Sequence, residues 1–371
     1  MYKVPFVNYP LQYKNIKKEL LRKFDEILSR GDLIYRKDLQ DFEKNIAKYT
    51  GVKYGVGTDS CTGAMFIALK ALGIKEGDEV ITVAHTYVAT IDVIIHCGAK
   101  PILVDIGKDY NINPDLIEKA ITEKTKAIMP VHLNGKCCQM DKIMAIAKKH
   151  KLFVVEDAAQ ALGATYKGKK AGGFGDIGCI SFYPAKMLGS YGEAGIALTN
   201  NKNLAIKMYL LRDHGELPPY LDKDRTHKIY LWGFNTILDN IQASVLNIKF
   251  RYFSGWIKRR REIAKKYISG LRLVKEIILP EFLAGDVFQN FVIRVQKREE
   301  LFNYLKKEGV ETLVSWRTPN HKQKLLKEIN NFKLPITELI SKEVISLPVY
   351  PELTDSQIDF VVEKIKKFYE R

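Results

Sequence analysis

The sequence lacks any apolar run of about 18 residues or more, so it predicts no membrane-spanning helix. The start of the chain has no apolar core followed by a small-residue cleavage site, so no secretory signal is expected. Cysteines are few, odd in number and without Cys-x-x-Cys spacing, which argues against a metal cluster or a disulfide framework. They are Cys61, Cys97, Cys137, Cys138 and Cys179. These absences favour a cytoplasmic protein without a bound metal.

Negative charge is also scarce, since 59 Lys and Arg residues outnumber 43 Asp and Glu residues and give a formal charge of +16. Such an excess attracts anionic ligands, including nucleic acids, or reflects lysines scattered over solvated helix faces. The densest basic run, residues 258–261, lies in a predicted amphipathic helix over 256–267, and no aromatic residues interleave a basic array. We therefore favour scattered surface charge and expect no nucleic-acid partner.

Internal repeats and low-complexity linkers are absent too, and apolar strands alternate with helices from about residue 50 to 200. Predicted strands cover residues 54–57, 79–82, 100–104, 127–130, 153–155 and 178–181. Predicted helices cover residues 62–72, 87–97, 114–121 and 140–150. This alternation indicates an α/β fold whose mostly parallel sheet is covered on both faces. In such sheets, ligands bind beyond the carboxyl ends of the strands.

The second half of the chain is more helical. One or two helices are predicted over 235–267, a strand over 287–295 and a final helix over 355–369. A chain of 371 residues suits a large domain and a smaller one. We expect a large domain over 1–250 and a compact α+β domain over 251–371, with the boundary in a long helix.

Lys186 stands out because of the residues around it. It lies in Ser181-Phe182-Tyr183-Pro184-Ala185-Lys186-Met187-Leu188-Gly189, directly after a predicted strand. Pro184 disfavours helix, and glycines at positions 189, 192 and 195 allow the backbone to approach a ligand closely. A lysine held there can form an imine with the aldehyde of pyridoxal phosphate (PLP) and later carry a proton. Without that context, a lysine is usually a solvated charge.

Asp157 and Tyr87 each have two interpretations. Asp157 ends the run Val154-Val155-Glu156-Asp157, where it either caps the next helix or keeps the pyridine nitrogen of PLP protonated. Gln160 would then reach the phenolic oxygen of the cofactor or the substrate. Tyr87, in Ala84-His85-Thr86-Tyr87, either stacks on the pyridine ring or belongs to the hydrophobic core.

A phosphate site is predicted at residues 57–64, Gly57-Thr58-Asp59-Ser60-Cys61-Thr62-Gly63-Ala64, between a strand and a helix. Hydroxyls and free amides at a helix N-terminus suit a phosphate, although Ser and Thr are also ordinary helix caps. Ser181 adds a further hydroxyl at the end of another strand.

Together these segments resemble the DegT/DnrJ/StrS family of sugar aminotransferases, which are PLP enzymes of fold type I. The resemblance extends from Gly31-Asp32-Leu33 to the tail at 347–354. Its most specific motifs are Gly73-Ile74 leading into Gly77-Asp78-Glu79-Val80, and residues 85–90, 156–163 and 181–189. It implies an aspartate-aminotransferase-like architecture, with a mostly parallel seven-stranded sheet in the large domain and a smaller C-terminal α+β domain.

The resemblance also implies roles for individual residues. Lys186 matches the Schiff-base lysine and Asp157 the partner of the pyridinium nitrogen. Gln160 matches the residue near the cofactor's O3′, and Tyr87 matches the stacking aromatic residue. PLP is therefore the expected cofactor.

Thr62 and Ser181 match phosphate ligands of the family. Asn235, in Gly233-Phe234-Asn235, matches an asparagine that reaches the phosphate of the neighbouring subunit, which implies a homodimer with shared active sites. Taken without the family, Asn235 would be a helix N-cap.

Three positions depart from the family pattern. Cys61 replaces a glycine in the phosphate loop, where it would line the cofactor site and alter the loop or the phosphate position. Ile237 stands where an arginine is usual, and Asn134 stands where a tyrosine is frequent. The last two changes affect expected substrate contacts more than cofactor binding.

The implied reaction transfers an amino group from L-glutamate to a keto carbon of a nucleotide-diphosphate-linked sugar. The stretch at 187–195 is nearer the form found in enzymes acting at C-3 than at C-4. A sugar dehydratase of the same family typically has His at the position of Lys186, and a non-catalytic regulator would need neither Lys186 nor Asp157. The nucleotide, the sugar and the pathway (O-antigen, capsule, S-layer glycan or antibiotic sugar) stay open. The specificity residues are expected within 214–230 and around Trp316-Arg317.

Overall fold

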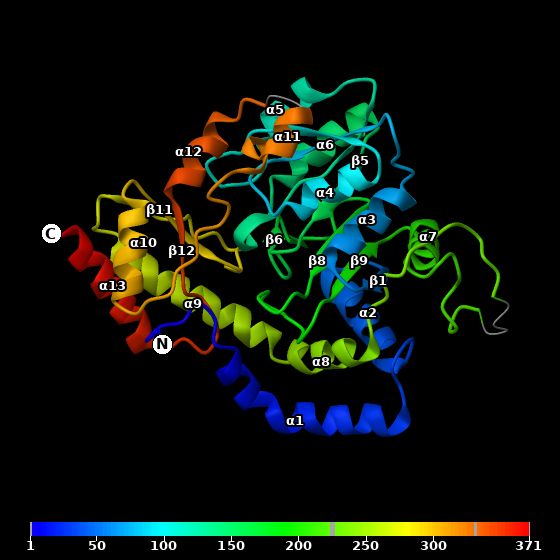
Figure 1. Cartoon of the computed structure of the whole chain (residues 1–371), viewed down its shortest axis with the longest axis horizontal. Helices are drawn as coiled ribbons and strands as arrows, with labels where there is room; N and C mark the ends of the chain where they lie inside the picture. Colours follow the sequence, from blue (N-terminus) through cyan, green and yellow to red (C-terminus); the bar gives the residue numbers. More distant parts are fainter. Residues whose placement is uncertain (1, 223–226, 330–331, 371) are drawn as a thin grey trace.

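The computed structural model describes residues 2–222, 227–329 and 332–370. Its main sheet has seven strands in the order β1-β9-β8-β5-β4-β2-β3 (Figure 1). They are β1 (Tyr54–Thr58), β2 (Glu79–Val83), β3 (Lys100–Val104), β4 (Thr125–Ile128), β5 (Phe153–Asp157), β8 (Ile177–Ser181) and β9 (Gly195–Thr199). β9 runs antiparallel to both neighbours, and the other pairings are parallel. The predicted mostly parallel sheet is confirmed.

Helices cover both faces of this sheet. On one face lie α3 (Cys61–Ala71), α4 (Ala89–His96) and α7 (Lys202–Arg212), and on the other lie α2 (Lys37–Thr50), α6 (Met140–His150) and α8 (Asn240–Phe250). Strand β9 shows how side chains from one strand reach both layers of helices. Ile196 and Leu198 pack with α2 and α8, whereas Ala197 packs with α3 and α7, because successive strand residues face opposite sides. The long first helix, α1 (Tyr9–Arg30), lies against α8 (Figure 1).

Two sequence predictions for this region need correction. Strand β9 was not predicted, because its glycine and alanine have low strand propensity and it is held in the sheet by the two flanking strands. The helix predicted over 114–121 is shorter and splits into α5 (Pro114–Ile117) and a 3₁₀ turn, η1 (Glu118–Ala120). A second 3₁₀ turn, η2 (Leu133–Gly135), and a short hairpin of β6 (Thr165–Tyr166) and β7 (Lys169–Lys170) complete this part.

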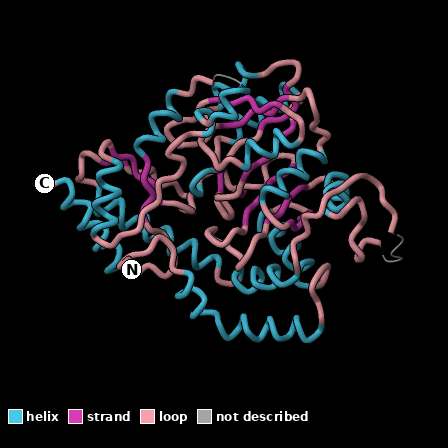
Figure 2. The backbone as a smooth tube through the Cα atoms, viewed as in Figure 1, coloured by secondary structure: helices cyan, strands magenta, loops and turns pink. Residues whose placement is uncertain are grey.

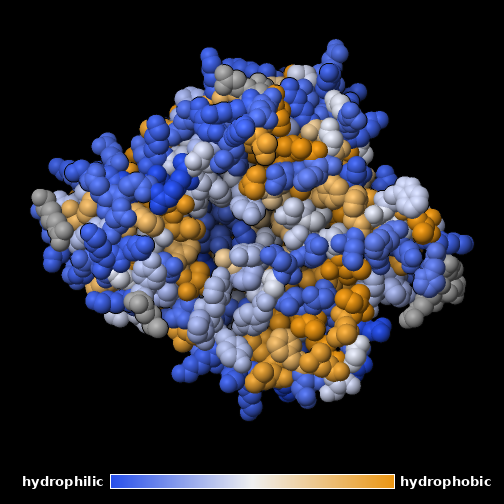
Figure 3. Space-filling model, in the orientation of Figure 1, coloured by the Kyte–Doolittle hydropathy of each residue, from blue (hydrophilic) through white to orange (hydrophobic). Residues whose placement is uncertain are grey.

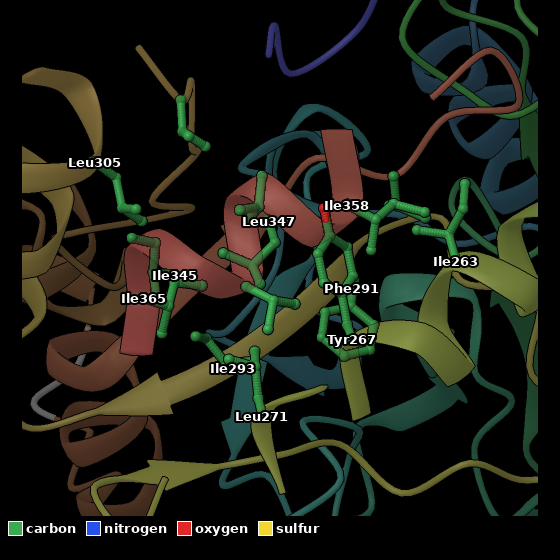
Figure 4. Packing of buried hydrophobic residues seen from close by; sticks show 14 of the residues in the cluster. Ile263, Tyr267, Leu271, Phe291, Ile293, Leu305, Ile345, Leu347, Ile358 and Ile365 are labelled. Atoms are coloured by element: carbon green, nitrogen blue, oxygen red, sulfur yellow. The ribbon is translucent and has the colours of Figure 1, made fainter. Parts of the chain in front are cut away.

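The C-terminal part has its own antiparallel sheet of β10 (Ile277–Ile278), β11 (Phe291–Val295) and β12 (Val344–Leu347). In Figure 2 these strands lie apart from those of the large sheet. α9 (Phe253–Leu271), α10 (Arg298–Lys307) and α13 (Asp355–Tyr369) pack on them around a separate core, part of which Figure 4 shows. The predicted final helix is confirmed, and the region predicted as one or two helices contains α8 and α9.

The strand predicted over 287–295 begins only at Phe291. Phe288 has a φ of 56°, which is incompatible with an extended strand, and the two residues after it turn toward the large sheet's ligand side. The apolar pattern in the sequence therefore begins before the true start of the strand.

Contacts between the two parts cross the predicted boundary. Val4 belongs to the C-terminal core and pairs with Val310, so the N-terminus lies near the C-terminus (Figure 1). Conversely, η3 (Asn320–Lys322), α11 (Lys324–Ile329) and α12 (Pro335–Glu343) extend toward the large sheet, and Asp105 after β3 accepts hydrogen bonds from Ile336 and Thr337. The division at residues 250/251 stays a prediction. Within the described ranges, no helix is long and apolar enough to cross a membrane.

Candidate functional site

A cavity of about 990 Å³ lies beyond the carboxyl ends of β5 and β8, between the large sheet and the C-terminal part. In Figure 3 a hollow with hydrophilic walls opens near the centre of the molecule. Of the eight residues predicted for the site, seven line this cavity and Asn235 does not. The seven are Lys186, Asp157, Gln160, Tyr87, Cys61, Thr62 and Ser181.

The loop that carries Lys186 is compact because backbone packs directly on backbone. A Cβ at Gly189 would lie 2.3 Å from the carbonyl oxygen of Pro184, and one at Gly195 would lie 2.3 Å from the carbonyl carbon of Ser60. These two glycines therefore allow close approach of the protein's own backbone rather than of a ligand, which corrects the sequence interpretation. The Nζ of the buried Lys249 donates a 2.6 Å hydrogen bond to the Gly189 carbonyl and fixes the end of the loop.

Gln289 holds the same loop on both sides of Lys186. Its Nε2 donates to the carbonyl of Ala185 at 3.0 Å, and its Oε1 accepts from the backbone N–H of Met187 at 2.9 Å. Gln289 is buried and lies just before β11, in the C-terminal part. Sequence reasoning missed this residue because no local pattern links it to a loop 100 residues earlier.

The amine of Lys186 lies in the cavity without a hydrogen-bond or ion-pair partner among the described residues. Burial lowers the pKa of Lys186, while nearby Cys61 and Asp157 act in the opposite direction. The lower pKa enlarges the fraction of neutral amine, which is the form that attacks an aldehyde or accepts a proton.

Asp157 ends β5 with its carboxylate almost completely buried. The Thr90 hydroxyl donates to Oδ2 at 2.7 Å, and the backbone N–H of Ala159 donates to Oδ1 at 3.1 Å. The alternative role as a helix cap is excluded, since the next helix along this fully described stretch is α7, starting at Lys202. The carboxylate is held in place yet keeps acceptor capacity for a donor in the cavity.

The neighbouring Glu156 points to the opposite side of β5 and has a structural role. Its carboxylate accepts hydrogen bonds from the backbone N–H groups of Gly172, Phe174 and Gly175 at 2.6–2.8 Å. Its Oε2 also lies 2.9 Å from Nε2 of His132. Alternation along the strand thus gives two adjacent acids different functions.

The N-terminus of α3 lines the same cavity as Lys186. Ser60 caps the helix, because its hydroxyl accepts from the N–H of Gly63 at 3.0 Å. No acceptor in the described part of the chain takes the N–H groups of Cys61 and Thr62, and the Thr62 side chain is exposed toward the cavity. The Cys61 side chain is instead buried in the cluster under α3. The loop therefore accommodates the cysteine without losing an anion-binding helix end.

Tyr87 and Gln160 complete the predicted wall. Tyr87 is 64% exposed, so the alternative interpretation as a core residue is wrong. Gln160 accepts from the backbone N–H of Asn134 at 3.0 Å and from the side chain of Asn290 at 3.5 Å. Asn134, at the position where the family often has tyrosine, also accepts from Asn290 at 3.2 Å. The three amides join η2 to the C-terminal part.

Asn235 lies exposed and outside the cavity, paired by a bridge to Asp213. It is not a helix N-cap either, because α8 starts at Asn240 and is capped by Asp239. In one of the two specificity regions suggested by the sequence, Trp316 lines the cavity. Its ring packs edge-on against the ring of the buried His85, with 5.2 Å between the ring centroids. In the other region, 214–230, residues 223–226 lie outside the described residues.

The fold and the site define a class of protein. A lysine after β8 and a buried aspartate at the end of β5 share one cavity, as in a PLP-dependent transferase of fold type I. The sequence profile of the DegT/DnrJ/EryC1/StrS aminotransferase family matches residues 14–366, and the chain belongs to this family.

Three relatives illustrate the match. The chain is 41% identical to the "Pleiotropic regulatory protein" of Geobacillus stearothermophilus, with 99% of this chain and 98% of that protein covered. It is 38% identical to the dTDP-3-amino-3,6-dideoxy-alpha-D-galactopyranose transaminase of Aneurinibacillus thermoaerophilus, with 98% and 99% covered. The crystal structure of DesV from S. venezuelae, in complex with a ketimine intermediate, aligns with a TM-score of 0.95 at 34% identity over 100% of both chains.

The protein is therefore a PLP-dependent aminotransferase, and its residues fit that cofactor. Lys186 offers the aldehyde an amine that is paired with no described residue, and Asp157 offers a buried carboxylate to the ring nitrogen. The free N–H groups at Cys61 and Thr62 offer donors to the phosphate.

Proposed function

We propose that this aminotransferase moves an amino group from L-glutamate to the C-3 keto carbon of a nucleotide-diphosphate-linked sugar. The observation that carries the transfer step is the presence of Lys186 and Asp157 in one cavity. The name of the Aneurinibacillus relative, a 3-amino sugar transaminase, supports the substrate class and the position of the nitrogen. The stretch at 187–195 favours C-3 independently.

PLP supplies an aldehyde that combines with amines and a ring that withdraws electrons from the reacting carbon. Asp157, held by Thr90 and Ala159, keeps a proton on the ring nitrogen. Lys186 accepts the proton of the glutamate α-carbon in the first half-reaction and gives one to the sugar carbon in the second. Its lowered pKa suits both transfers, because the neutral amine is the base.

We further infer a homodimer whose two sites each use Asn235 of the other subunit. Residues 213–222 and 227–232, which follow α7, project from the body of the molecule (Figure 1). They expose apolar side chains next to Asn235: Ile229 is 60%, Tyr230 58% and Trp232 89% exposed. Contiguous exposed apolar residues mark interaction surfaces. Because the proposed substrates are cytoplasmic metabolites, we place the reaction in the cytoplasm.

Subunit complementation tests the shared site. Asn235→Asp puts a negative charge where the phosphate is expected, and Lys186→Ala removes the reacting amine. When equal amounts of these two inactive variants reassort at random, half of the dimers are mixed and each mixed dimer has one intact site of two, so about a quarter of wild-type activity should be recovered. Recovery of no activity, with heterodimers shown by native mass spectrometry, would contradict the exchange of Asn235.

A regulatory role is the alternative, because the Geobacillus relative is named as a regulator. Retention of both Lys186 and Asp157 in the cavity favours catalysis over regulation, and Lys186 also disfavours a dehydratase. A panel of 3-keto and 4-keto nucleotide sugars, given to enzyme first loaded with the glutamate amino group, tests the proposal. Transfer to a 3-keto sugar is expected. Transfer only to 4-keto sugars would contradict amination at C-3, and transfer to none of the sugars would contradict nucleotide-linked sugars as the substrate class.

A further inference from the structure

Asp59 is an acid in the cofactor cavity that the amino-transfer chemistry described above does not use. It lies between β1 and α3, is exposed, and lines the cavity beside Cys61 and Thr62, whose N–H groups offer donors to the phosphate. A carboxylate repels an anionic phosphate, so Asp59 is not expected to bind the cofactor directly. Its partners are hydroxyl groups of the protein instead.

One oxygen of the Asp59 carboxylate binds two hydroxyl groups. The Thr236 hydroxyl donates to Oδ1 at 2.5 Å, and the Ser60 hydroxyl donates to the same atom at 2.9 Å. Hydrogen bonds from hydroxyls to ionised carboxylates are shorter and stronger than those between neutral groups. Because the Ser60 hydroxyl also caps α3, Asp59 links Thr236 to the helix end that offers donors to the phosphate.

Thr236 packs tightly against that helix end. It is buried, and a Cβ at Gly63 would lie 2.2 Å from its hydroxyl oxygen and 2.6 Å from Oδ1 of Asp59. A larger residue at position 63 would therefore displace the contact between Thr236 and Asp59. The glycine in the first turn of α3 thus leaves room for a side chain from the distant segment after α7.

Thr236 directly follows Asn235, whose surroundings are the opposite. Asn235 is exposed, and its side chain has no hydrogen-bond partner in the described part of the chain. The backbone next to it is held at two places: the Thr236 N–H donates to the carbonyl of Arg212 at 3.0 Å, and the Asp59 N–H donates to the carbonyl of Thr236 at 3.0 Å. The Thr236 hydroxyl adds a side-chain bond to these, so the segment is fixed while the asparagine stays available.

We propose that Asp59 is a positioning residue for the cofactor site of the other subunit. Through Thr236 it holds the segment that presents Asn235 to the neighbouring phosphate, so the phosphate loop of one chain helps to build the site of its partner. The proposal rests on the exchange of Asn235 proposed above. A segment that is already ordered loses less conformational entropy when its asparagine binds, and the affinity for the cofactor rises accordingly.

Mixed dimers test this role across the subunit boundary. One chain carries Lys186→Ala and cannot form the imine, so the visible band reports PLP binding only in the other, reporting chain. Thr236→Val placed in the Lys186→Ala chain should raise the Kd of the reporting site for PLP roughly 10-fold, the low end for a hydrogen bond to a charged group, because the backbone bonds remain. The same substitution in the reporting chain should have a smaller effect, because Ser60 still caps α3.

Two further variants serve as controls. Thr236→Ser keeps the hydroxyl and should bind PLP like the wild type in both placements. Thr199→Val removes another buried threonine hydroxyl, which donates to the carbonyl of Asp176 at 2.7 Å, at the end of β9 away from Ser60. It should leave the Kd of the reporting site unchanged in either chain.

The placements give distinct outcomes. An equal rise of the Kd in both placements would show general damage, and a rise only with the substitution in the reporting chain would show that the contact serves its own site; either result would overturn the proposal. Asn235→Ala in the Lys186→Ala chain separates the two proposals. If it leaves the Kd unchanged, the exchange of Asn235 fails; if it raises the Kd and Thr236→Val does not, only the positioning by Asp59 fails.

Discussion

Gln289→Ala tests whether the C-terminal part positions Lys186. The substitution removes both hydrogen bonds that hold the backbone at Ala185 and Met187. Each bond is worth about 1 kcal/mol, and leaving a buried group unsatisfied costs about 1–3 kcal/mol. We therefore expect the loop to lose about 2–4 kcal/mol of local stability.

Two assays measure the effect. The rate of the glutamate half-reaction should fall about 100-fold, because a displacement of 1 Å at a reacting group has effects of this size. The pH dependence of the visible band of the lysine-bound cofactor should also shift, since the surroundings of the amine change. If the substitution only reduced the fraction of folded protein, the molecules that retain PLP would show the same pH dependence of this band as the wild type.

Gln242 offers a matched control on the same loop. Its Oε1 accepts from the backbone N–H of Tyr191 at 3.0 Å, at an exposed position. Gln242→Ala should change little in either the rate of the glutamate half-reaction or the pH dependence of the visible band. Gln289→Glu keeps the acceptor for Met187 but not the donor for Ala185, so it should lie between Gln289→Ala and wild type. A Gln289→Ala enzyme with wild-type rate and titration would refute the positioning role.

Three further predictions follow from buried charges. Asp157→Asn should slow the glutamate half-reaction at least about 100-fold in single turnovers, because the ring nitrogen loses its anionic partner; an undiminished rate would contradict this. Glu43→Ala should lower the free energy of unfolding by about 3–5 kcal/mol in denaturant titrations, because Glu43 pairs with the buried Arg212 at 2.6 Å and its loss leaves that charge unpaired. Asp41→Ala, which removes an exposed ion pair with Lys37, should lower it by less than about 1 kcal/mol. Burial lowers the pKa of Lys249 to about 7, so between pH 7 and about 10 the unfolded chain binds a proton on this lysine that the folded chain does not. The free energy of unfolding of the wild type should therefore rise relative to that of Lys249→Met as the pH rises through this window. A constant difference between the two proteins across the window would contradict the lowered pKa.

The main sheet and the heart of the site were predictable because they depend on local signals. Lys186 and Asp157 each follow an apolar strand, and carboxyl ends of adjacent parallel strands meet at one edge. The N-terminus of α3 carried its own signal in the hydroxyls at 58–62. These parts required no knowledge of long-range packing.

The remaining parts depend on contacts between distant segments. Gln289 and Asn290 looked like strand residues, and only the backbone turn at Phe288 brings them to the cavity. Arg260 lines the cavity, although it belonged to a basic run with no sign that one member was buried. Asn235 lies outside the cavity of its own chain, so the role implied by the family resemblance requires a second subunit.

The most direct test of the account is the visible absorption of the purified protein with PLP, before and after L-glutamate, in wild type and Lys186→Ala. We expect the wild type to show the band of a lysine-bound cofactor and to lose it when glutamate is added. Lys186→Ala should show neither the band nor the change. A wild-type protein that stays colourless with PLP, or a Lys186→Ala variant that still bleaches with glutamate at the wild-type rate, would contradict Lys186 as the residue that binds the cofactor and moves the proton.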